Sequence, residues 1–180
     1  VVLFGHGLGV SCHDDTVVRP ARLLNEQGFI VFAPELPLHG ERGGSGTDWQ
    51  EVVSSWAAFW AGDGRNQLVD EWLHVLAHVE KKYDLPVFYF GLSLGTQYGL
   101  LFLAQITGVT ASVLGLFGSE PSPKFQVMNY AAPRVSIPIY FVQKMDDEIH
   151  SPETTTHLFE SLGSEHKILD SSAGKHAEVS

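Results

Sequence analysis

Cysteine and positive charge are both scarce in this chain. Cys12 is the only cysteine in 180 residues, so no disulfide can form within the chain, and a reducing compartment such as the cytoplasm is expected. Lys and Arg together number 11 against 21 Asp and Glu, which gives a formal net charge of −10. Because these few basic residues form no cluster, the sequence predicts no nucleic-acid-binding surface.

Long apolar runs are missing as well. No run approaches the length of about 20 residues that a membrane-spanning helix needs, so no membrane span is expected. Hydrophobic residues nevertheless make up 44% of the chain, which is typical of an ordered globular protein. A length of 180 residues fits a single domain over 1–180 with one core and no separate lid domain.

Short apolar segments alternate with segments of helical character along the chain. Strands are expected at residues 1–4, 29–33, 87–90, 111–117, 137–142 and 166–169. Helices are expected at residues 16–27 (beginning near Pro20), 49–60, 66–82, 96–106 and 152–162. This alternation predicts an α/β fold, with a mostly parallel sheet of about six strands and helices on both faces.

Two long loops rich in proline are expected at residues 34–48 and 118–136. The second of them is short for a helical lid, which favours an open site. The expected helix 49–60 is the alternative cover for that site.

The most informative segment is Gly91-Leu92-Ser93-Leu94-Gly95. It lies between an expected strand and an expected helix, and G-x-S-x-G in that context holds a serine on a sharp, strained turn. The flanking glycines permit close packing of the backbone that a Cβ would prevent. The pattern therefore predicts an exposed serine hydroxyl at the edge of the sheet, with a helix N-terminus behind it.

A second motif, His6-Gly7-Leu8-Gly9, directly follows the first expected strand. An H-G-x-G in this place resembles the oxyanion-hole loop of α/β-hydrolases, in which backbone N–H groups bind the oxyanion. The resemblance implies that the amides of Leu8 and Leu94 are the donors. His6 is expected to brace the loop with its side chain.

Two further candidates follow Ser93 along the chain. Asp146 comes after the expected strand 137–142, and His176 comes after the expected strand 166–169. Ser, Asp and His in this order, each after a strand, match the order of the α/β-hydrolase triad. The carboxyl ends of parallel strands are also where such sheets bind ligands.

These motifs together resemble the α/β-hydrolase superfamily, and within it the small lidless carboxylesterases related to dienelactone hydrolase. The stretch 33–42 is similar to the P-D-x-P-x-H-G-x-R segment of many such esterases, with Glu35 in place of the usual Asp. The resemblance runs from Val1 to His176 but omits the family's first two strands and the helix that usually follows the histidine. An exposed sheet edge would need cover from a homo-oligomer, a partner or missing chain.

The resemblance implies a role for each candidate. Ser93 would be the nucleophile, His176 the base that takes its proton, and Asp146 the acid that orients the imidazole. Asp147 is the close competitor of Asp146, because one residue of register would exchange them, and Glu120 is a third option.

His6, Gly7 and His39 are candidates to line the substrate. Other histidines, among them His150, are expected at loop or helix surfaces. The polar cluster of His13, Asp14 and Asp15 lacks a second ligand group at useful spacing, so no metal is expected, and the resemblance implies no cofactor.

The predicted function is that of a serine hydrolase that cleaves small carboxylic esters, with thioesters or lactones as further substrates, through an acyl-enzyme. The alternative is a non-catalytic protein of the same fold that keeps the pocket for binding a ligand, since a fold by itself does not establish a function.

Overall fold

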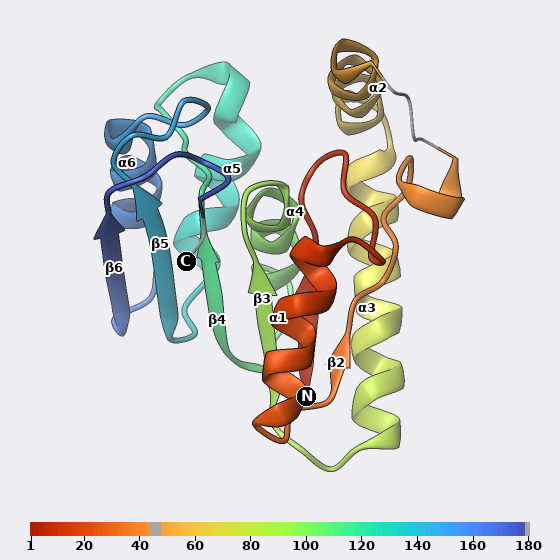
Figure 1. Ribbon diagram of the computed structural model, residues 1–180. Helices are drawn as coiled ribbons and strands as arrows, with labels where there is room; N and C mark the ends of the chain where they lie inside the picture. The colour runs from red at the N-terminus through yellow and green to blue at the C-terminus, as the bar shows by residue number, and fades with distance from the viewer. Residues whose placement is uncertain (44–47, 179–180) are drawn as a thin grey trace.

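The computed structural model describes residues 1–43 and 48–178, and Figure 1 shows one sheet flanked by helices. Residues 44–47 of the expected loop 34–48 lie outside the described residues. The sheet has six strands, all parallel, in the order β2-β1-β3-β4-β5-β6. The strands are β1 (Val2–Gly5), β2 (Val31–Phe32), β3 (Val87–Gly91), β4 (Val109–Gly115), β5 (Ile139–Lys144) and β6 (Lys167–Ser172). The predicted α/β fold with about six strands is confirmed.

Helices cover both faces of this sheet. The helices are α1 (Asp15–Glu26), α2 (Trp49–Ala61), α3 (Gly64–Lys82), α4 (Leu94–Leu103), α5 (Gln126–Ala131) and α6 (Pro152–Ser161). In Figure 1, α1 lies in front of the sheet, α3 and α4 lie behind it, and α2 stands beyond the carboxyl ends of the strands. None of the helices in residues 1–43 and 48–178 is long and apolar enough to cross a membrane.

The core lies between the sheet and the helices behind it. Trp72 of α3 packs against Tyr89 of β3 and against Tyr98 and Phe102 of α4, with ring centroids 5.5–5.8 Å apart. All four rings are buried. Aromatic rings at these separations add to the stabilisation from area burial, so α4 is held firmly against β3, the strand that leads to Ser93.

The front face of the sheet is only partly covered. Tyr140 of β5 and Ile168 of β6 are 42% and 63% exposed on this face. They border a groove of about 630 Å³ that also contacts Leu24 of α1 and Phe88 of β3. Ser93 is not among the residues that line this groove.

Two local predictions need correction. The expected loop 118–136 contains the short helix α5, and Met128 and Ala131 of that helix join the core. A six-residue helix is too short to give a periodic signal in the sequence. Helix α1 begins at Asp15, not near Pro20, and holds Pro20 in its interior.

The parallel strands bring distant segments together at one edge. The loops after β1, β3, β4, β5 and β6 all leave the sheet at its carboxyl end (Figure 1). This is the edge at which open α/β sheets bind ligands. Residues separated by up to 170 positions in the sequence therefore meet there.

Helix α4 approaches strand β1 through a glycine. A Cβ on Gly95 would lie 2.5 Å from the carbonyl oxygen of Gly5 in β1. The Gly5 carbonyl and the backbone that would carry the Cβ both belong to the packed core, so neither can move aside cheaply.

We therefore expect Gly95→Ala to lower the free energy of unfolding by about 2 kcal/mol or more, as overpacking of a core does. Gly62→Ala is the matched control, because the nearest atom to its Cβ is 3.5 Å away, and it should change stability by less than about 0.5 kcal/mol. Urea unfolding followed by circular dichroism measures both, and equal effects of the two changes would contradict the packing described here.

Candidate functional site

Ser93 occupies the turn between β3 and α4 in a left-handed backbone conformation. Its φ is 55° and its ψ is −120°, a region that residues with a Cβ rarely adopt and that costs on the order of 1–3 kcal/mol. The amide of Ser93 donates a hydrogen bond to the carbonyl of Gly115 at 2.9 Å. This bond ties the turn to the end of β4.

Buried side chains hold the same turn from behind. The hydroxyl of Thr96 accepts a hydrogen bond from the amide of Gly115 and lies 2.8 and 2.7 Å from the carbonyl oxygens of Gly91 and Gly115. The hydroxyl of Tyr89 donates to the carbonyl of Gly95 at 2.7 Å. These contacts fix both glycines of the motif, so the Ser93 hydroxyl points from a rigid support.

His176 joins Ser93 to Asp147. Its Nε2 lies 2.9 Å from Ser93 Oγ, and its Nδ1 lies 2.8 Å from Asp147 Oδ2. An ionised carboxylate can only accept, so Nδ1 carries the hydrogen and donates it to Asp147. In the neutral ring, Nε2 then accepts the hydrogen bond of the Ser93 hydroxyl. The side chains of Asp147 and His176 are only 2% and 14% exposed.

The Asp147 carboxylate is stabilised as an anion. Burial alone would raise its pKa, but hydrogen bonds from the amide of His150, from the His176 ring and from the amide of Ile149 together lower it. The two amides donate to Oδ1 at 2.9 and 2.8 Å. They leave Oδ2 free to accept from His176, and the carboxylate is therefore charged at neutral pH.

Asp146, the predicted partner, makes no hydrogen bond to the His176 ring within the described residues, and Asp147, the alternative one residue along, makes it instead. Oδ2 of Asp146 accepts a hydrogen bond from the amide of Gly174, and its own amide donates to the carbonyl of Gly174. Asp146 thus holds the loop that carries His176. Two adjacent carboxylates on a turn cannot be ranked from sequence, because their directions depend on which backbone amides each one caps.

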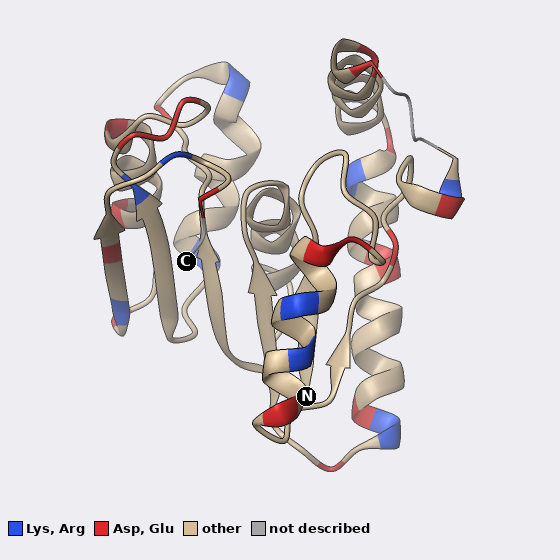
Figure 2. Cartoon of the chain, in the orientation of Figure 1, with Lys and Arg blue, Asp and Glu red and all other residues tan. Residues whose placement is uncertain are grey.

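Glu120 likewise makes no hydrogen bond to the His176 ring within the described residues. Its side chain is exposed and accepts a hydrogen bond from the hydroxyl of Ser122. Figure 2 shows the acidic segment 146–148 on the loop between β5 and α6, at the carboxyl edge of the sheet. The carboxylate that pairs with His176 comes from this loop.

The loop after β1 is fixed by its own histidine. The amide of Leu36 donates to His6 Nε2 at 3.1 Å, so the hydrogen of the neutral ring is on Nδ1, which donates to the carbonyl of Gly7 at 3.0 Å. Burial is the largest influence on the pKa of His6 and lowers it. The expectation that His6 braces the loop is thus supported by both of its ring nitrogens.

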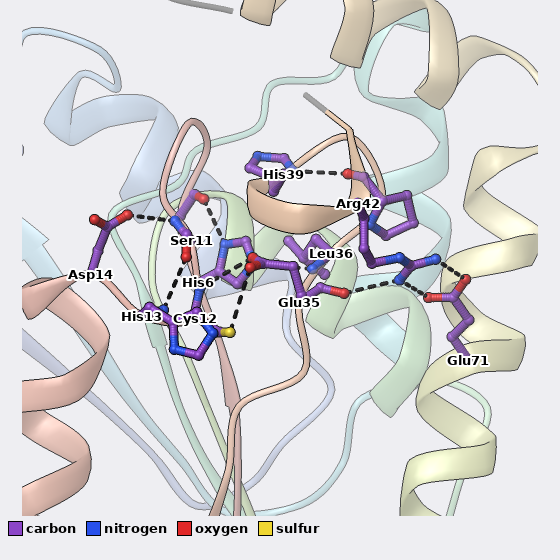
Figure 3. A network of polar contacts seen from close by, with 12 residues as sticks. His6, Ser11, Cys12, His13, Asp14, Glu35, Leu36, His39, Arg42 and Glu71 are labelled. Carbon is purple, nitrogen blue, oxygen red and sulfur yellow. Dashed lines mark hydrogen bonds and ion pairs between the residues drawn. The ribbon is translucent and has the colours of Figure 1, made fainter. Parts of the chain in front are cut away.

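Glu35 holds the far end of the same loop (Figure 3). Its carboxylate accepts from the amide of Cys12 at 3.1 Å and from the Cys12 thiol at 3.5 Å. Burial and this carboxylate raise the pKa of the thiol, which stays protonated. Oε1 of Glu35 also lies 3.2 Å from His6 Nε2, but the ring is neutral near pH 7 and the contact is not an ion pair.

An ion pair connects this network to α3. The guanidinium of Arg42 donates to both carboxylate oxygens of Glu71 at 2.7 and 2.8 Å and to the carbonyl of Glu35 at 2.9 Å. Figure 3 shows the three residues in one row beside the loop of His6. Within the stretch 33–42, singled out in the sequence, Glu35 and Arg42 therefore support the loop rather than the pocket.

A pocket of about 410 Å³ opens beside Ser93 and His176. Its walls come from the loops after β1, β3, β4, β5 and β6 and from helices α1 and α2, so α2 does overhang the site. Apart from Ser93 and His176, the lining is mostly apolar, with Leu8, Val10, Val17, Trp49, Trp56, Leu94, Leu116, Phe117 and Ile149 among its members.

His6 and Gly7 also line this pocket, but His39 does not. His39 is buried behind the wall, where its ring packs against the rings of His6 and Trp56. No group of three His, Cys, Asp or Glu side chains within 1–43 and 48–178 could hold a metal ion.

His150 was expected at the surface and instead lines the pocket. Its ring centroid lies 4.7 Å from that of Phe117 and 6.0 Å from that of His176. The sequence signal that could have found it is its position three residues after Asp147, on the turn whose amides cap that carboxylate.

Solved structures resemble this chain over nearly its whole length. No family model and no curated protein matches the chain. A cold-adapted esterase from an Arctic intertidal metagenomic library, solved with bound polyethylene glycol, is 30% identical to it with a TM-score of 0.86. The match covers 99% of this chain and 74% of the esterase. The chain belongs to the α/β-hydrolase superfamily.

Less similar structures share the α/β-hydrolase fold alone. A monoacylglycerol lipase from Paleococcus ferrophilus is 19% identical with a TM-score of 0.69, over 97% of this chain and 85% of the lipase. A protein of Klebsiella pneumoniae assigned to the dienelactone hydrolases is 14% identical with a TM-score of 0.77, over 98% of this chain and 75% of that protein. At these identities the two structures confirm the expected α/β-hydrolase fold.

Proposed function

We propose that this α/β-hydrolase cleaves carboxylic esters through an acyl-enzyme formed on Ser93. The observation that carries the proposal is the continuous chain of hydrogen bonds from Ser93 Oγ through His176 to Asp147, at 2.9 and 2.8 Å. The 30% identical neighbour is an esterase, which supports the same chemistry.

The first half of the reaction forms the acyl-enzyme. Nε2 of His176 takes the proton of the Ser93 hydroxyl as Oγ attacks the ester carbonyl carbon. Asp147 stabilises the imidazolium and keeps Nδ1 as a donor. When the tetrahedral intermediate collapses, the bond to the leaving alcohol breaks and His176 gives that alcohol its proton. Water then repeats the sequence on the acyl-enzyme and releases the carboxylic acid.

The oxyanion would be bound by the amides of Leu8 and Leu94. Both residues line the pocket with Ser93, and the first amides of a helix such as α4 have no intrahelical partner. The carbonyl of Gly7 and the amide of Leu8 belong to one peptide unit and point in opposite directions. By holding that carbonyl, His6 fixes the direction of the Leu8 amide.

The pocket supports a small substrate with an apolar acyl chain. A volume of about 410 Å³ is in the range of small-molecule sites. The same steps apply to thioesters and lactones, in which a thiol or a tethered hydroxyl is the leaving group. A pure ligand-binding role, the alternative, would not need a base hydrogen-bonded to a strained serine.

The direct test is hydrolysis of p-nitrophenyl esters from acetate to palmitate. We expect activity in the wild type and a loss on the order of 10⁴-fold or more in Ser93→Ala, because the nucleophile is removed. A folded wild-type protein with no more activity than Ser93→Ala would favour the binding role instead.

A matched pair of variants tests which carboxylate orients His176. Asp147→Asn should lower kcat by roughly 10³–10⁴-fold, because the amide can donate to Nδ1 and select the wrong tautomer. Asp146→Asn keeps an oxygen that accepts from the amide of Gly174 and should change kcat by less than about threefold. The reverse order of the two effects would restore Asp146 as the catalytic acid.

A further inference from the structure

One titratable side chain in the pocket has no part in the proposed mechanism. His150 lines the same cavity as Ser93 and His176, and its ring lies between those of Phe117 and His176, 4.7 and 6.0 Å away between centroids. Its backbone amide caps Asp147, a contact that any residue other than proline would make at this position. The imidazole itself therefore needs another explanation.

The ring nitrogens of His150 make no hydrogen bond to any residue in the described part of the chain, and only its backbone amide does. Burial, the largest influence, lowers the pKa of His150 to about 4. Of its charged neighbours, Asp147 acts against this shift, whereas His176 and Lys124 add to it. The neutral ring thus presents one donor and one acceptor at neutral pH.

The wall next to this ring is apolar. Leu116, Phe117 and Ile149 line the pocket with it, and none of these side chains can pair with an imidazole nitrogen. A bound ester excludes solvent from the wall that it touches. The ring nitrogens then form hydrogen bonds only if the substrate carries a hydrogen-bonding group. A polar group that loses water and gains no such bond weakens the binding free energy.

The position of His150 indicates which half of the ester it contacts. In the proposed reaction His176 delivers its proton to the leaving oxygen, so the alcohol half of the ester lies against His176. His150 lines the same pocket with its ring centroid 6.0 Å from that of His176, so we expect a group two or three bonds beyond the ester oxygen to come within its reach.

We propose that His150 is a specificity-determining residue that selects esters whose alcohol half carries a hydroxyl group close to the ester oxygen, such as glycol esters. The imidazole accepts the hydrogen bond of that hydroxyl or donates to its oxygen. The inference rests on the proposed ester hydrolysis at Ser93 and adds the class of alcohol to it.

Two isosteric substrates test the proposal. 2-Hydroxyethyl butyrate and propyl butyrate differ only by a hydroxyl in place of a terminal methyl group, and released butyric acid is titrated for both. We expect wild type to prefer the hydroxyethyl ester in kcat/KM. In His150→Leu the ratio of the two kcat/KM values should fall about tenfold, which corresponds to about 1.4 kcal/mol.

Two further variants keep the test independent of folding defects. His150→Phe retains an aromatic ring against Phe117 but removes both nitrogens, and it should lose the preference as His150→Leu does. His150→Asn retains a donor and an acceptor and should keep the ratio within about threefold of wild type. Because each value is a ratio within one protein, a general loss of activity does not affect it.

Ethyl glycolate and ethyl propionate form a control pair with the hydroxyl on the acyl half, and their ratio should not respond to His150. If wild type hydrolyses the esters but has the same ratio of kcat/KM for the two butyrates as His150→Leu and His150→Phe, the inference is overturned. The proposed ester hydrolysis at Ser93 would be unaffected by that result. The inference would also be overturned if the His150 variants changed the kcat/KM ratio of ethyl glycolate to ethyl propionate but left the ratio of the two butyrates unchanged. A folded wild type that hydrolyses none of the esters would instead overturn the proposed function, and this inference with it.

Discussion

The strained backbone at Ser93 is the constraint on which the site depends. A residue with a Cβ is held at a φ of 55°, and the surrounding structure must compensate for the free energy that this conformation costs. The compensation comes from contacts that only a glycine-flanked turn permits, since a Cβ on Gly91 or Gly95 would lie within 2.7 Å of backbone oxygen. The turn is therefore a consequence of how closely α4 packs against β1 and β3.

The remaining parts of the site are brought to Ser93 by the parallel sheet. The histidine follows β6, its carboxylate partner follows β5, and the amide of Leu8 follows β1. Each loop is anchored by hydrogen bonds separate from the chemistry: Asp146 to the loop of His176, His6 and Glu35 to the loop of Leu8. Such supporting contacts keep the reactive groups aligned before a substrate binds, which is where much of the catalytic power of preorganised sites arises.

Much of this could be predicted from the sequence. The alternation of apolar runs and helical segments gave the six strands and their parallel arrangement, and the G-x-S-x-G and H-G-x-G motifs identified the loops of Ser93 and Leu8. The errors have a common cause. Each concerns the direction in which a side chain on a turn points, and hydrophobic periodicity holds no information about that direction. This applies to the choice between Asp146 and Asp147, to the surface assignment of His150 and to the direction of His39. Helix α5 was missed because six residues are too few to show a period.

The most direct test of the account is reaction of the folded protein with a fluorophosphonate probe, followed by mass spectrometry of its peptides. If His176 activates Ser93, one adduct should form on the peptide that contains Ser93, and His176→Ala should prevent it while Asp146→Asn should not. A folded wild-type protein that remains unlabelled, or that is labelled equally well without His176, would contradict the assignment of Ser93 as an activated nucleophile.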